Sequence, residues 1–291
     1  MQVLSNTNEV REPRQYFMLK QSELAVAYAQ NIDQPNIPPP LRDSANRSGF
    51  ARSNGLRDCE IPASIPTSQA KLNVLAVIPA RGGSKGLPRK NTKRLCGKPL
   101  LSYSIEVALK AKLIDRVVVT TDDEEIMGIA AEYGPDIAIK RPGNLAKDNS
   151  LISGAVAHVT NHLSKQGFRA DFTVVLFPTH PFRTPGMLDY LTSKGAQGFN
   201  PVLTVKPLDI LPKRFLIPRG ENFAPLFHDS ASISRWYRHY GTFSGHHRNM
   251  PTKTFFHLLT DPITLIDIDY IEDFYLAEEV ISNGFFDFEL N

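Results

Sequence analysis

The stretch of sequence that decides the fold runs from residue 72 to residue 91 and reads LNVLAVIPARGGSKGLPRKN. Its first part, Leu72–Pro79, is a short apolar run that is rich in β-branched residues and ends at a proline. A run of this length and composition predicts a buried β-strand that leads directly into a loop. Because an open α/β sheet binds its ligand beyond the carboxyl ends of its strands, this loop is the first candidate for a functional site.

The loop that follows the strand has the composition of an anion-binding loop. Glycines let backbone N–H groups turn inward and approach an anion closely. Basic side chains held close together repel one another unless a polyanion lies between them, and a nucleoside triphosphate would serve. The alternative is a surface turn with solvated charges. The loop contains three glycines and four basic residues: Gly82, Gly83, Gly86, Arg81, Lys85, Arg89 and Lys90.

Two common nucleotide-binding loops do not match this segment. The spacing G-x-x-x-x-G-K-S/T of the P-loop is absent from it, and so is the spacing G-x-G-x-x-G of dinucleotide-binding proteins. The segment therefore disfavours both a P-loop ATPase and a nicotinamide-dependent dehydrogenase.

Beyond the loop, strand-like and helix-like segments alternate along the chain, which predicts an α/β domain with a mainly parallel sheet. We expect further strands at Arg116–Thr121, Asp136–Ile139, Phe172–Phe177, Pro201–Val205 and Ile263–Ile268. We expect helices at Leu100–Ala111, from an Asp122 cap to Tyr133, at Leu151–Ser164, Met187–Ser193 and Tyr270–Ser282.

The domain organisation follows from where this alternation holds. Residues 71–291 form the expected catalytic domain, and residues 206–258 break the rhythm within it, which predicts an inserted lobe of short strands. Residues 1–70 contain proline and polar stretches, without a structural period apart from one short helical pattern. We interpret them as a largely disordered extension, with a docking arm for another protein as the alternative.

Composition sets outer limits on function. Of the 291 residues, 42% are hydrophobic and 22% are charged, as in an ordinary globular protein. The net charge of +3 is too small to indicate nucleic-acid binding, and no apolar run is long enough to span a membrane. With 2 cysteines the chain is not a disulfide scaffold. The N-terminus lacks the layout of a signal peptide, so we expect a cytoplasmic protein.

The segment IPARGGSKGLPRKN, residues 78–91, resembles the N-terminal signature of the cytidylyltransferases that activate nonulosonic acids. These are the CMP-N-acetylneuraminate (acylneuraminate) synthetases and their pseudaminate and legionaminate relatives. The resemblance covers about residues 73–282. It implies a Rossmann-like nucleotide-diphospho-sugar transferase fold whose inserted lobe serves dimerisation and the acceptor, and it implies a homodimer. It also implies a reaction in which the anomeric hydroxyl of a nine-carbon 2-keto acid attacks the α-phosphorus of CTP and pyrophosphate leaves.

The resemblance also implies roles for individual residues. Arg81, Ser84 and Lys85 would hold the triphosphate, Lys90 would neutralise charge at the α-phosphate, and Asn91 would read the cytosine. The segment Arg141–Ser150 resembles a second family segment that contacts the nucleotide. The expected nucleotide-binding residues are Ala80, Arg81, Gly82, Gly83, Ser84, Lys85, Lys90, Asn91, Arg141, Asp148 and Ser150. The expected catalytic residues are Arg81, Lys85, Lys90 and Asp267.

A pair of carboxylates near the C-terminus is the candidate metal site. Alternation along the expected strand Ile263–Ile268 would place Asp267 and Asp269 on the same side. Two close carboxylates raise each other's pKa unless a cation lies between them, and Mg²⁺ prefers one or two carboxylates together with phosphate oxygens. The family has the same Asp-x-Asp pattern. The alternative is that Asp269 only caps the helix that begins at Tyr270.

The segment Phe177–Arg183 resembles the family's Pro-Thr-x-Pro segment, which lies near the acceptor sugar. Thr179 and Arg183 are therefore the expected acceptor residues, with an ion pair at the surface as the alternative for Arg183. Sialic acid enzymes usually have Gln where Phe177 stands, which favours a pseudaminate or legionaminate acceptor. Two other functions stay open: a nucleotidyltransferase that uses UTP, GTP or the eight-carbon sugar Kdo, and a non-catalytic protein that binds a sugar nucleotide.

Overall fold

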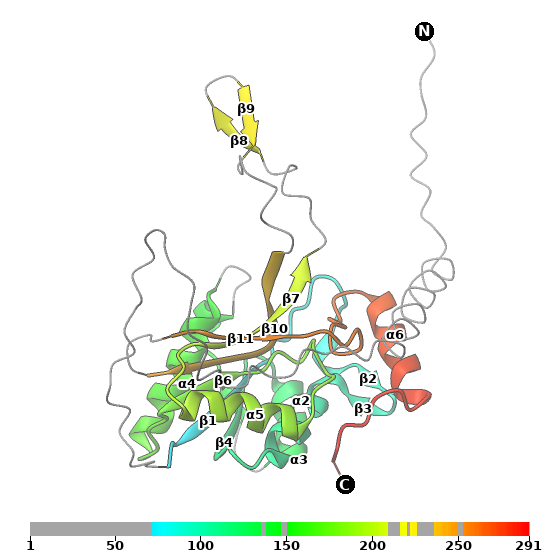
Figure 1. Ribbon diagram of the computed structural model, residues 1–291. Coiled ribbons are helices and arrows are strands. Elements are labelled where there is room, and N and C mark those ends of the chain that lie inside the picture. Colours follow the sequence, from blue (N-terminus) through cyan, green and yellow to red (C-terminus); the bar gives the residue numbers. More distant parts are fainter. Residues whose placement is uncertain are drawn as a thin grey trace, which may run out of the picture. The chain divides into compact units, whose positions relative to one another are not determined.

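A seven-stranded sheet forms the centre of the computed structural model of the protein, in the order β11-β7-β10-β6-β1-β4-β5 (Figure 1). The structure describes residues 71–134, 138–146, 150–208, 216–219, 222–225, 236–248 and 253–290. The predicted extension, residues 1–70, and the predicted nucleotide contact Asp148 lie outside these residues.

The sheet is mainly parallel, as the alternation predicted. β1 pairs in parallel with β4 and β6, β4 with β5, and β7 with β11, whereas β10 is antiparallel to both of its neighbours. The strands are β1 Val74–Pro79, β4 Arg116–Thr121, β5 Ala138–Lys140, β6 Phe172–Val175, β7 Val202–Leu208, β10 Trp236–His247 and β11 Phe255–Leu258. Two small hairpins pair β2 Arg94–Leu95 with β3 Lys98–Pro99 and β8 Leu216–Arg219 with β9 Asn222–Pro225.

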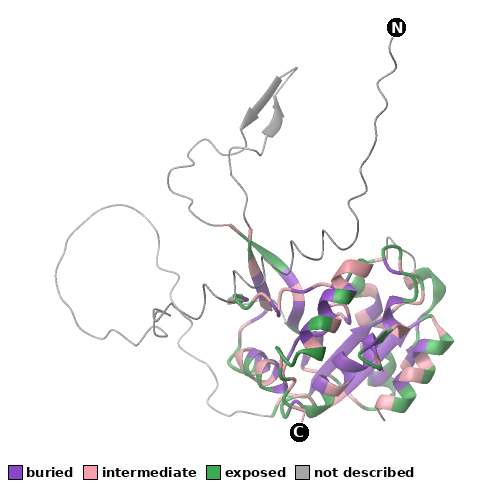
Figure 2. Ribbon diagram, turned by 90° about the vertical axis from the view of Figure 1, so that its right-hand side faces the viewer, coloured by how far each residue is buried: buried purple, intermediate pink, exposed green. Residues whose placement is uncertain are grey.

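Helices cover both faces of the sheet because side chains alternate along each strand. Leu75 and Val77 of β1 pack with Val159 of α4 on one face. Ala76 and Ile78 belong to the larger core cluster on the other face, which α2, α3 and α5 complete. Figure 2 shows the strands as largely buried and the outer helix surfaces as exposed. The helices are α2 Leu100–Lys110, α3 Glu124–Tyr133, α4 Ile152–Lys165, α5 Pro185–Ala196 and α6 Ile271–Ser282, with short 3-10 helices η1 Lys90–Thr92 and η2 Gly143–Leu145.

The predicted strand Ile263–Ile268 is wrong. The chain forms turns there, with Leu265 N–H donating to Pro262 O at 3.2 Å and Ile266 N–H donating to Ile263 O at 3.1 Å. Its backbone reaches other segments through single hydrogen bonds: Ile268 N–H donates to Thr179 O at 2.8 Å, and Leu265 O accepts from the Tyr240 hydroxyl at 2.5 Å. The isoleucines that suggested a strand are buried, so the apolar pattern reports burial rather than extended structure.

The predicted inserted lobe is also only partly correct. β10 and β11 lie within residues 206–258, yet both are strands of the central sheet, and β10 fills the space between β6 and β7. A smaller correction concerns α3, whose cap is Asp123 rather than Asp122: the Asp123 side chain accepts a hydrogen bond from Ile126 N–H.

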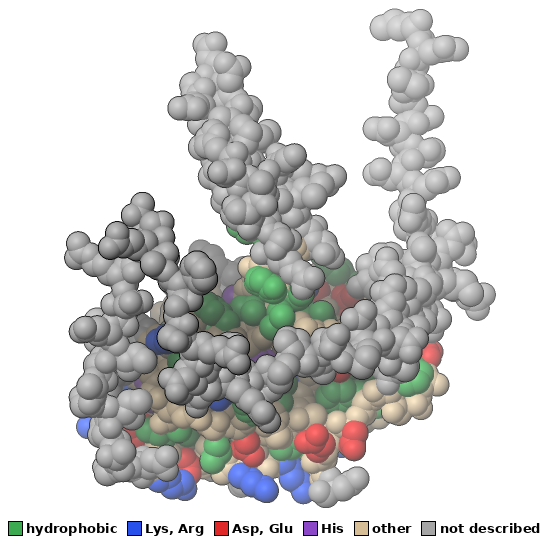
Figure 3. All heavy atoms as spheres, in the orientation of Figure 1, with side chains coloured by type: hydrophobic (Ala, Val, Ile, Leu, Met, Phe, Trp, Pro, Cys, Tyr) green, Lys and Arg blue, Asp and Glu red, His purple; other side chains and the backbone are tan. Residues whose placement is uncertain are grey.

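Two further observations concern the whole described surface. None of the helices in the described part of the chain is long and apolar enough to cross a membrane. On the face drawn in Figure 3, Lys and Arg side chains lie among Asp and Glu side chains along the lower edge of the described surface. That mixture agrees with the small net charge of +3.

Candidate active site

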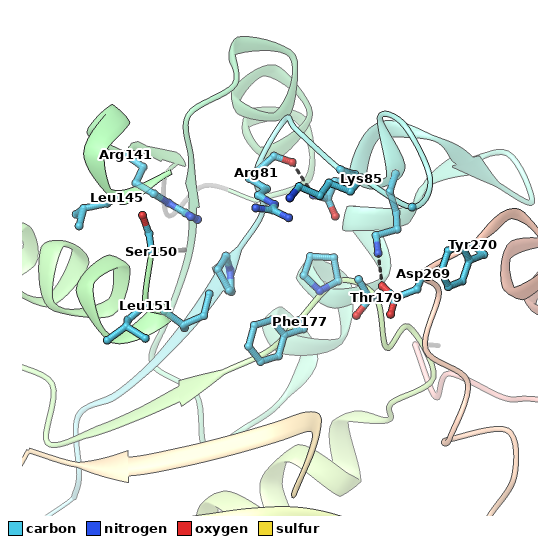
Figure 4. A pocket seen from close by; sticks show the side chains of 17 residues that line it. Arg81, Lys85, Arg141, Leu145, Ser150, Leu151, Phe177, Thr179, Asp269 and Tyr270 are labelled. Atoms are coloured by element: carbon cyan, nitrogen blue, oxygen red, sulfur yellow. Dashed lines mark hydrogen bonds and ion pairs between the residues drawn. The ribbon is translucent and has the colours of Figure 1, made fainter. Parts of the chain in front are cut away.

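A cavity of about 520 Å³ opens where the parallel strands β1, β5 and β6 end (Figure 4). The loops after these strands and the segment before α6 supply its walls. This is the edge of an α/β sheet at which ligands bind. The lining residues are Pro79, Arg81, Ser84, Lys85, Gly86, Lys90, Asn91, Arg141, Leu145, Ser150, Leu151, Ile152, Phe177, Pro178, Thr179, Asp269 and Tyr270.

The loop after β1 supplies much of this wall, as predicted from its composition. Ala80 extends the strand by one hydrogen bond, from its N–H to Thr120 O at 3.0 Å. The loop then returns to the protein at η1, where the side chain of Asn91 donates to Arg81 O at 2.9 Å. This bond ties the end of the loop to its beginning. Of the predicted loop residues, Ala80, Gly82 and Gly83 do not line the cavity, whereas Arg81, Ser84, Lys85, Lys90 and Asn91 do.

Lys90 and Asp269 meet across the cavity wall. Lys90 is 8% exposed, and its Nζ lies 2.8 Å from Asp269 Oδ1. A second contact brings the same segments together: a Cβ on Gly86 would lie 2.3 Å from the backbone oxygen of Asp269. The N-terminal loop and the carboxylate segment therefore form one continuous surface, although 179 residues separate Lys90 from Asp269.

Asp267 lies behind this surface and does not line the cavity. Its Oδ1 is buried without a hydrogen-bond partner and lies 3.7 Å from Nδ1 of His180. Burial, together with the charge of the nearby Arg183, lowers the pKa of His180 to about 3, so this histidine is neutral and forms no ion pair with Asp267. Burial raises the pKa of Asp267, while a hydrogen bond from the Thr179 side chain and the charge of Lys90 act in the opposite direction.

These two carboxylates fit a divalent cation of the Mg²⁺ type. The buried Asp267 oxygen lacks a partner, and Asp269 stands in the cavity wall. Within the described residues, no group of three or more His, Cys, Asp or Glu side chains is arranged to hold a metal. Mg²⁺ does not need such a group, since it binds through one or two carboxylates plus phosphate oxygens and water.

Arg141 stands at the other end of the cavity. It is 6% exposed, its Nη2 donates to Thr120 O at 2.7 Å, and its Nε is buried without a hydrogen-bond partner. Burial lowers the pKa of its guanidinium. Ser150 does not cap α4, whose N-cap is Leu151: its hydroxyl donates to Asn144 O at 2.9 Å. It lines the cavity, and its contact with a nucleotide stays a prediction.

The structure places one of the two predicted acceptor residues, Thr179, in the cavity wall, and the other, Arg183, in the core. Phe177 and Thr179 line the cavity beside Asp269, which brings the Pro-Thr segment to the carboxylates (Figure 4). Arg183 is 1% exposed, and its guanidinium donates to Thr242 O, Ser104 Oγ and Phe177 O at 2.6, 3.0 and 2.7 Å. Its position contradicts the predicted contact with a sugar carboxylate, because all three nitrogens are already bonded inside the core. The surface ion pair that was its alternative is wrong for the same reason.

Several residues of the site were not expected from the sequence. Tyr270 is 62% exposed in the cavity wall, and Leu151, at 77% exposed, stands in the opposite wall. They are the N-cap residues of α6 and α4, and no motif in the sequence singled them out. Asp122 and Asp123, in the turn after β4, contact the loop that follows β1, and only the pairing of β4 with β1 could have indicated that.

The known proteins to which this chain is similar in sequence are cytidylyltransferases and synthases of CMP-linked sugar acids. Residues 75–171 match the cytidylyltransferase family. The chain is 34% identical over 161 residues to a CMP-N,N'-diacetyllegionaminic acid synthase of Legionella pneumophila, covering 54% of this chain and 69% of that protein. It is 39% identical over 123 residues to a pseudaminic acid cytidylyltransferase of Campylobacter jejuni, covering 42% of this chain and 53% of that protein. An N-acylneuraminate cytidylyltransferase of Escherichia coli is 40% identical over 114 residues, which are 39% of this chain and 26% of that protein.

Solved structures agree on the fold. A CMP:2-keto-3-deoxy-manno-octonic acid synthetase complexed with CTP has a TM-score of 0.54 at 18% identity and covers 73% of this chain and 99% of its own. A 4-diphosphocytidyl-2C-methyl-D-erythritol synthase has a TM-score of 0.52 at 13% identity, covering 72% of this chain and 99% of its own. At these identities the likeness establishes a Rossmann-like α/β fold.

Proposed function

The chain belongs to the cytidylyltransferase family of CMP-nonulosonate synthetases, and from that premise we propose that it transfers CMP from CTP to the anomeric hydroxyl of a nonulosonic acid, releasing pyrophosphate. The observation that carries the proposal is the joining of the Arg81–Asn91 loop and the Asp269 segment into one cavity wall, with Lys90 and Asp269 2.8 Å apart. A bound triphosphate would be neutralised by the basic side chains of the loop. The divalent metal ion that accompanies a triphosphate would be bound by the carboxylates.

The positions of the lining residues along the cavity support an assignment of each part of the two substrates to one region of it. Arg141 and Ser150 stand at one end, Arg81, Ser84 and Lys85 in the loop between, and Thr179 with Asp269 at the other end (Figure 4). We assign the nucleoside to the Arg141 end, the triphosphate to the loop and the acceptor to the Thr179 end. The α-phosphorus then lies between the loop and Thr179, where the acceptor hydroxyl can attack it.

Catalysis in such a site is mainly positioning and charge stabilisation. The acceptor oxygen forms a bond to the α-phosphorus while the bond from that phosphorus to the bridging oxygen of pyrophosphate breaks, and pyrophosphate carries the electron pair away. We assign to Lys90 the stabilisation of negative charge on the α-phosphate, and to Arg81 the binding of the departing phosphates. The acceptor hydroxyl releases its proton to water in this step.

We assign a divalent cation, in our proposal Mg²⁺, to Asp267 and Asp269. The chemistry it would supply is neutralisation of charge on the phosphate oxygens. In the structure Lys90 Nζ donates to Oδ1 of Asp269 at 2.8 Å, and this contact orients the carboxylate in the cavity wall.

The proposed function is tested by pyrophosphate release with CTP and a panel of neuraminate, legionaminate and pseudaminate, in the presence of Mg²⁺. We expect release with CTP and at least one of these acids, and loss of turnover in Lys90→Ala and Asp267→Ala with the fold retained by circular dichroism. Turnover near the wild-type rate in either variant would contradict the assigned roles. Nucleotide binding without release for any acid would favour the non-catalytic alternative.

The acceptor itself is the open part of this proposal. Phe177 lines the acceptor end of the cavity and cannot form a hydrogen bond to a sugar hydroxyl through its side chain. It therefore favours pseudaminate or legionaminate over N-acetylneuraminate. Substituting Phe177→Gln should move the preference toward N-acetylneuraminate, measured as the ratio of kcat/KM values for the two acids.

We also infer a homodimer from the family. Apolar side chains are exposed on β10 and β11, with Tyr237 at 46% and Phe256 at 60%. Light scattering would measure the assembly, and Phe256→Lys should shift it toward the monomer if this face is the interface.

A further inference from the structure

The triphosphate loop is attached to the turn between β4 and α3 by two consecutive carboxylates. Asp122 Oδ1 accepts the backbone N–H of Gly82 at 3.2 Å. Asp123 accepts from Arg89 through both of its oxygens, at 2.5 Å from Nη1 and 3.2 Å from Nη2. Gly82 and Arg89 stand near the two ends of the loop, so the β4–α3 turn holds both ends at once.

Asp123 is packed directly against the loop backbone. A Cβ on Gly82 would lie 2.3 Å from Asp123 Oδ2 and 2.9 Å from its Cβ. Distances below about 3 Å are inside van der Waals contact, so only glycine fits at this position. The same carboxylate caps α3 by accepting Ile126 N–H at 3.1 Å, which fixes it in space independently of the loop.

Arg89 determines how the chain turns into η1. Its φ of 55° and ψ of 28° lie in the left-handed region, which is unfavourable for a residue with a side chain. From this conformation its carbonyl oxygen accepts the N–H groups of Thr92 and Lys93, both at 3.1 Å. The turn so formed buries Lys90 and Asn91, which are the residues that reach Asp269 and Arg81.

The Arg89 guanidinium offsets the strain by a forked contact with two acids. It pairs with Asp123 and also with Glu125, in the first turn of α3. These contacts raise the pKa of Arg89 and lower the pKa of Asp123. Unpaired carboxylates beside a triphosphate loop would repel the ligand, so the pairing also neutralises them. In the structure Arg89 is therefore turned toward α3, whereas the sequence suggested that it would face the polyanion.

We propose that Arg89 and Asp123 are positioning residues for the reaction: their ion pair holds the loop in the conformation that binds CTP, and sets the turn that presents Lys90. The inference rests on the proposed function. It assigns to Arg89 no contact with substrate, and it predicts that the loop loses affinity for CTP when the pair is removed although the domain stays folded.

The decisive variant is Arg89→Gly, because glycine accepts the left-handed conformation without strain. A purely structural role predicts that melting temperature and affinity fall together. Our proposal predicts a melting temperature within a few degrees of wild type and a dissociation constant for CTP about tenfold higher, the effect of losing a charge-assisted contact. Arg89→Lys keeps the charge but not the fork, and should fall between.

Asp123→Ser tests the other partner, since serine can still cap α3 while the negative charge is lost. We expect the same weakening of CTP binding, measured by titration calorimetry, and a higher KM for CTP. The matched control is Glu124→Gln, which removes an exposed pair with Lys140 from the same helix turn and should leave affinity unchanged.

The outcomes separate the two proposals. If wild type binds CTP and Arg89→Gly binds it equally well, the positioning role is overturned. If affinity falls only in variants that also lose melting temperature, the role is structural and the proposal is likewise overturned. If wild-type protein binds no CTP, the proposed function itself fails, and comparison of UTP and GTP identifies the nucleotide.

Discussion

At the scale of single residues, Arg183 shows how burial changes the meaning of a charged side chain. Its place after the Pro-Thr segment suggested a contact with the sugar carboxylate. In the fold it joins three elements by donating to Thr242 O, Ser104 Oγ and Phe177 O. Burial lowers its pKa to about 9, partly opposed by Asp267, so it is a buried cation held mainly by neutral acceptors.

We predict that Arg183→Lys lowers the free energy of unfolding by about 3 kcal/mol, because one ammonium cannot satisfy three separated acceptors and unpaired buried groups are costly. Chemical denaturation measures this. Arg169→Lys, at an exposed position, is the control. If Arg183→Lys had wild-type stability but a higher KM for the acceptor, the result would contradict this argument and support the role in sugar binding that the sequence predicted for Arg183.

Lys90 and Asp269 show the opposite case, in which the structure brings together two residues that the sequence placed at one site. Their residue types and motifs predicted a cation and a carboxylate at one site, and the structure brings them within 2.8 Å. Asp267, by contrast, lies behind the cavity wall rather than beside Asp269 on a strand. The motifs identified these residue types from the local sequence. They could not identify the contact between Lys90 and Asp269, because that contact depends on distant segments meeting.

At the scale of elements, one aromatic ring joins α5 to the sheet. Phe172 of β6 is fully buried, and its ring lies where a Cβ on Gly195 of α5 or Gly245 of β10 would be, at 2.6 and 2.4 Å. Close approach of these elements therefore requires glycine at both positions. Nothing in the sequence distinguishes these glycines from those in turns.

We predict that Gly245→Ala lowers the free energy of unfolding by about 1–3 kcal/mol, because the added methyl group overpacks the core around Phe172. Thermal denaturation measures the loss. Gly128→Ala in α3 is the matched control: a Cβ there meets nothing within 4 Å, so a helix-favouring alanine should stabilise by about 0.5–1 kcal/mol. Equal stability of the two variants would contradict the packing argument.

A half-buried histidine on β11, His257, gives a pH dependence. Burial lowers the pKa of His257 below its ordinary value of 6.5, so the folded protein resists protonation that the unfolded chain accepts. The stability contribution is thus complete above pH 6.5 and decreases as pH falls below it.

His257→Gln should therefore reduce the loss of melting temperature between pH 7 and pH 5.5 by about 2 °C. His162→Gln, exposed on α4, is the control and should retain the wild-type slope. Equal slopes in wild type and His257→Gln would show that this histidine does not contribute.

At the scale of the whole molecule, the described strands and helices account for one α/β domain from residue 71 onward. The interpretation of residues 1–70 as an extension predicts that a chain beginning at Lys71 keeps its melting temperature within about 2 °C and its kcat/KM, since an extension without a core of its own adds little stability. Calorimetry and the pyrophosphate assay measure both. A large loss in either would favour the docking interpretation or a structural role.

The sequence by itself determined the class of fold, the strands β1 and β4 and the chemistry of the loop between β1 and η1. These depend on patterns within a few residues: an apolar run, a cluster of glycines and cations, a periodic helix. Its predictions were wrong at Ile263–Ile268, where burial without extension produced the same apolar pattern as a strand. They were incomplete at 206–258, where β10 and β11 return to the central sheet.

Only the tertiary structure decided which charged side chains of the loop line the cavity. The loop's cations looked equivalent in sequence, yet Arg89 turns to Asp123 and Lys90 turns to Asp269. The partners lie 34 and 179 residues away, brought near by the parallel pairing of β1 with β4 and by the return of the chain before α6. A charge acts on whatever lies within a few ångströms of it, and sequence distance does not report that separation.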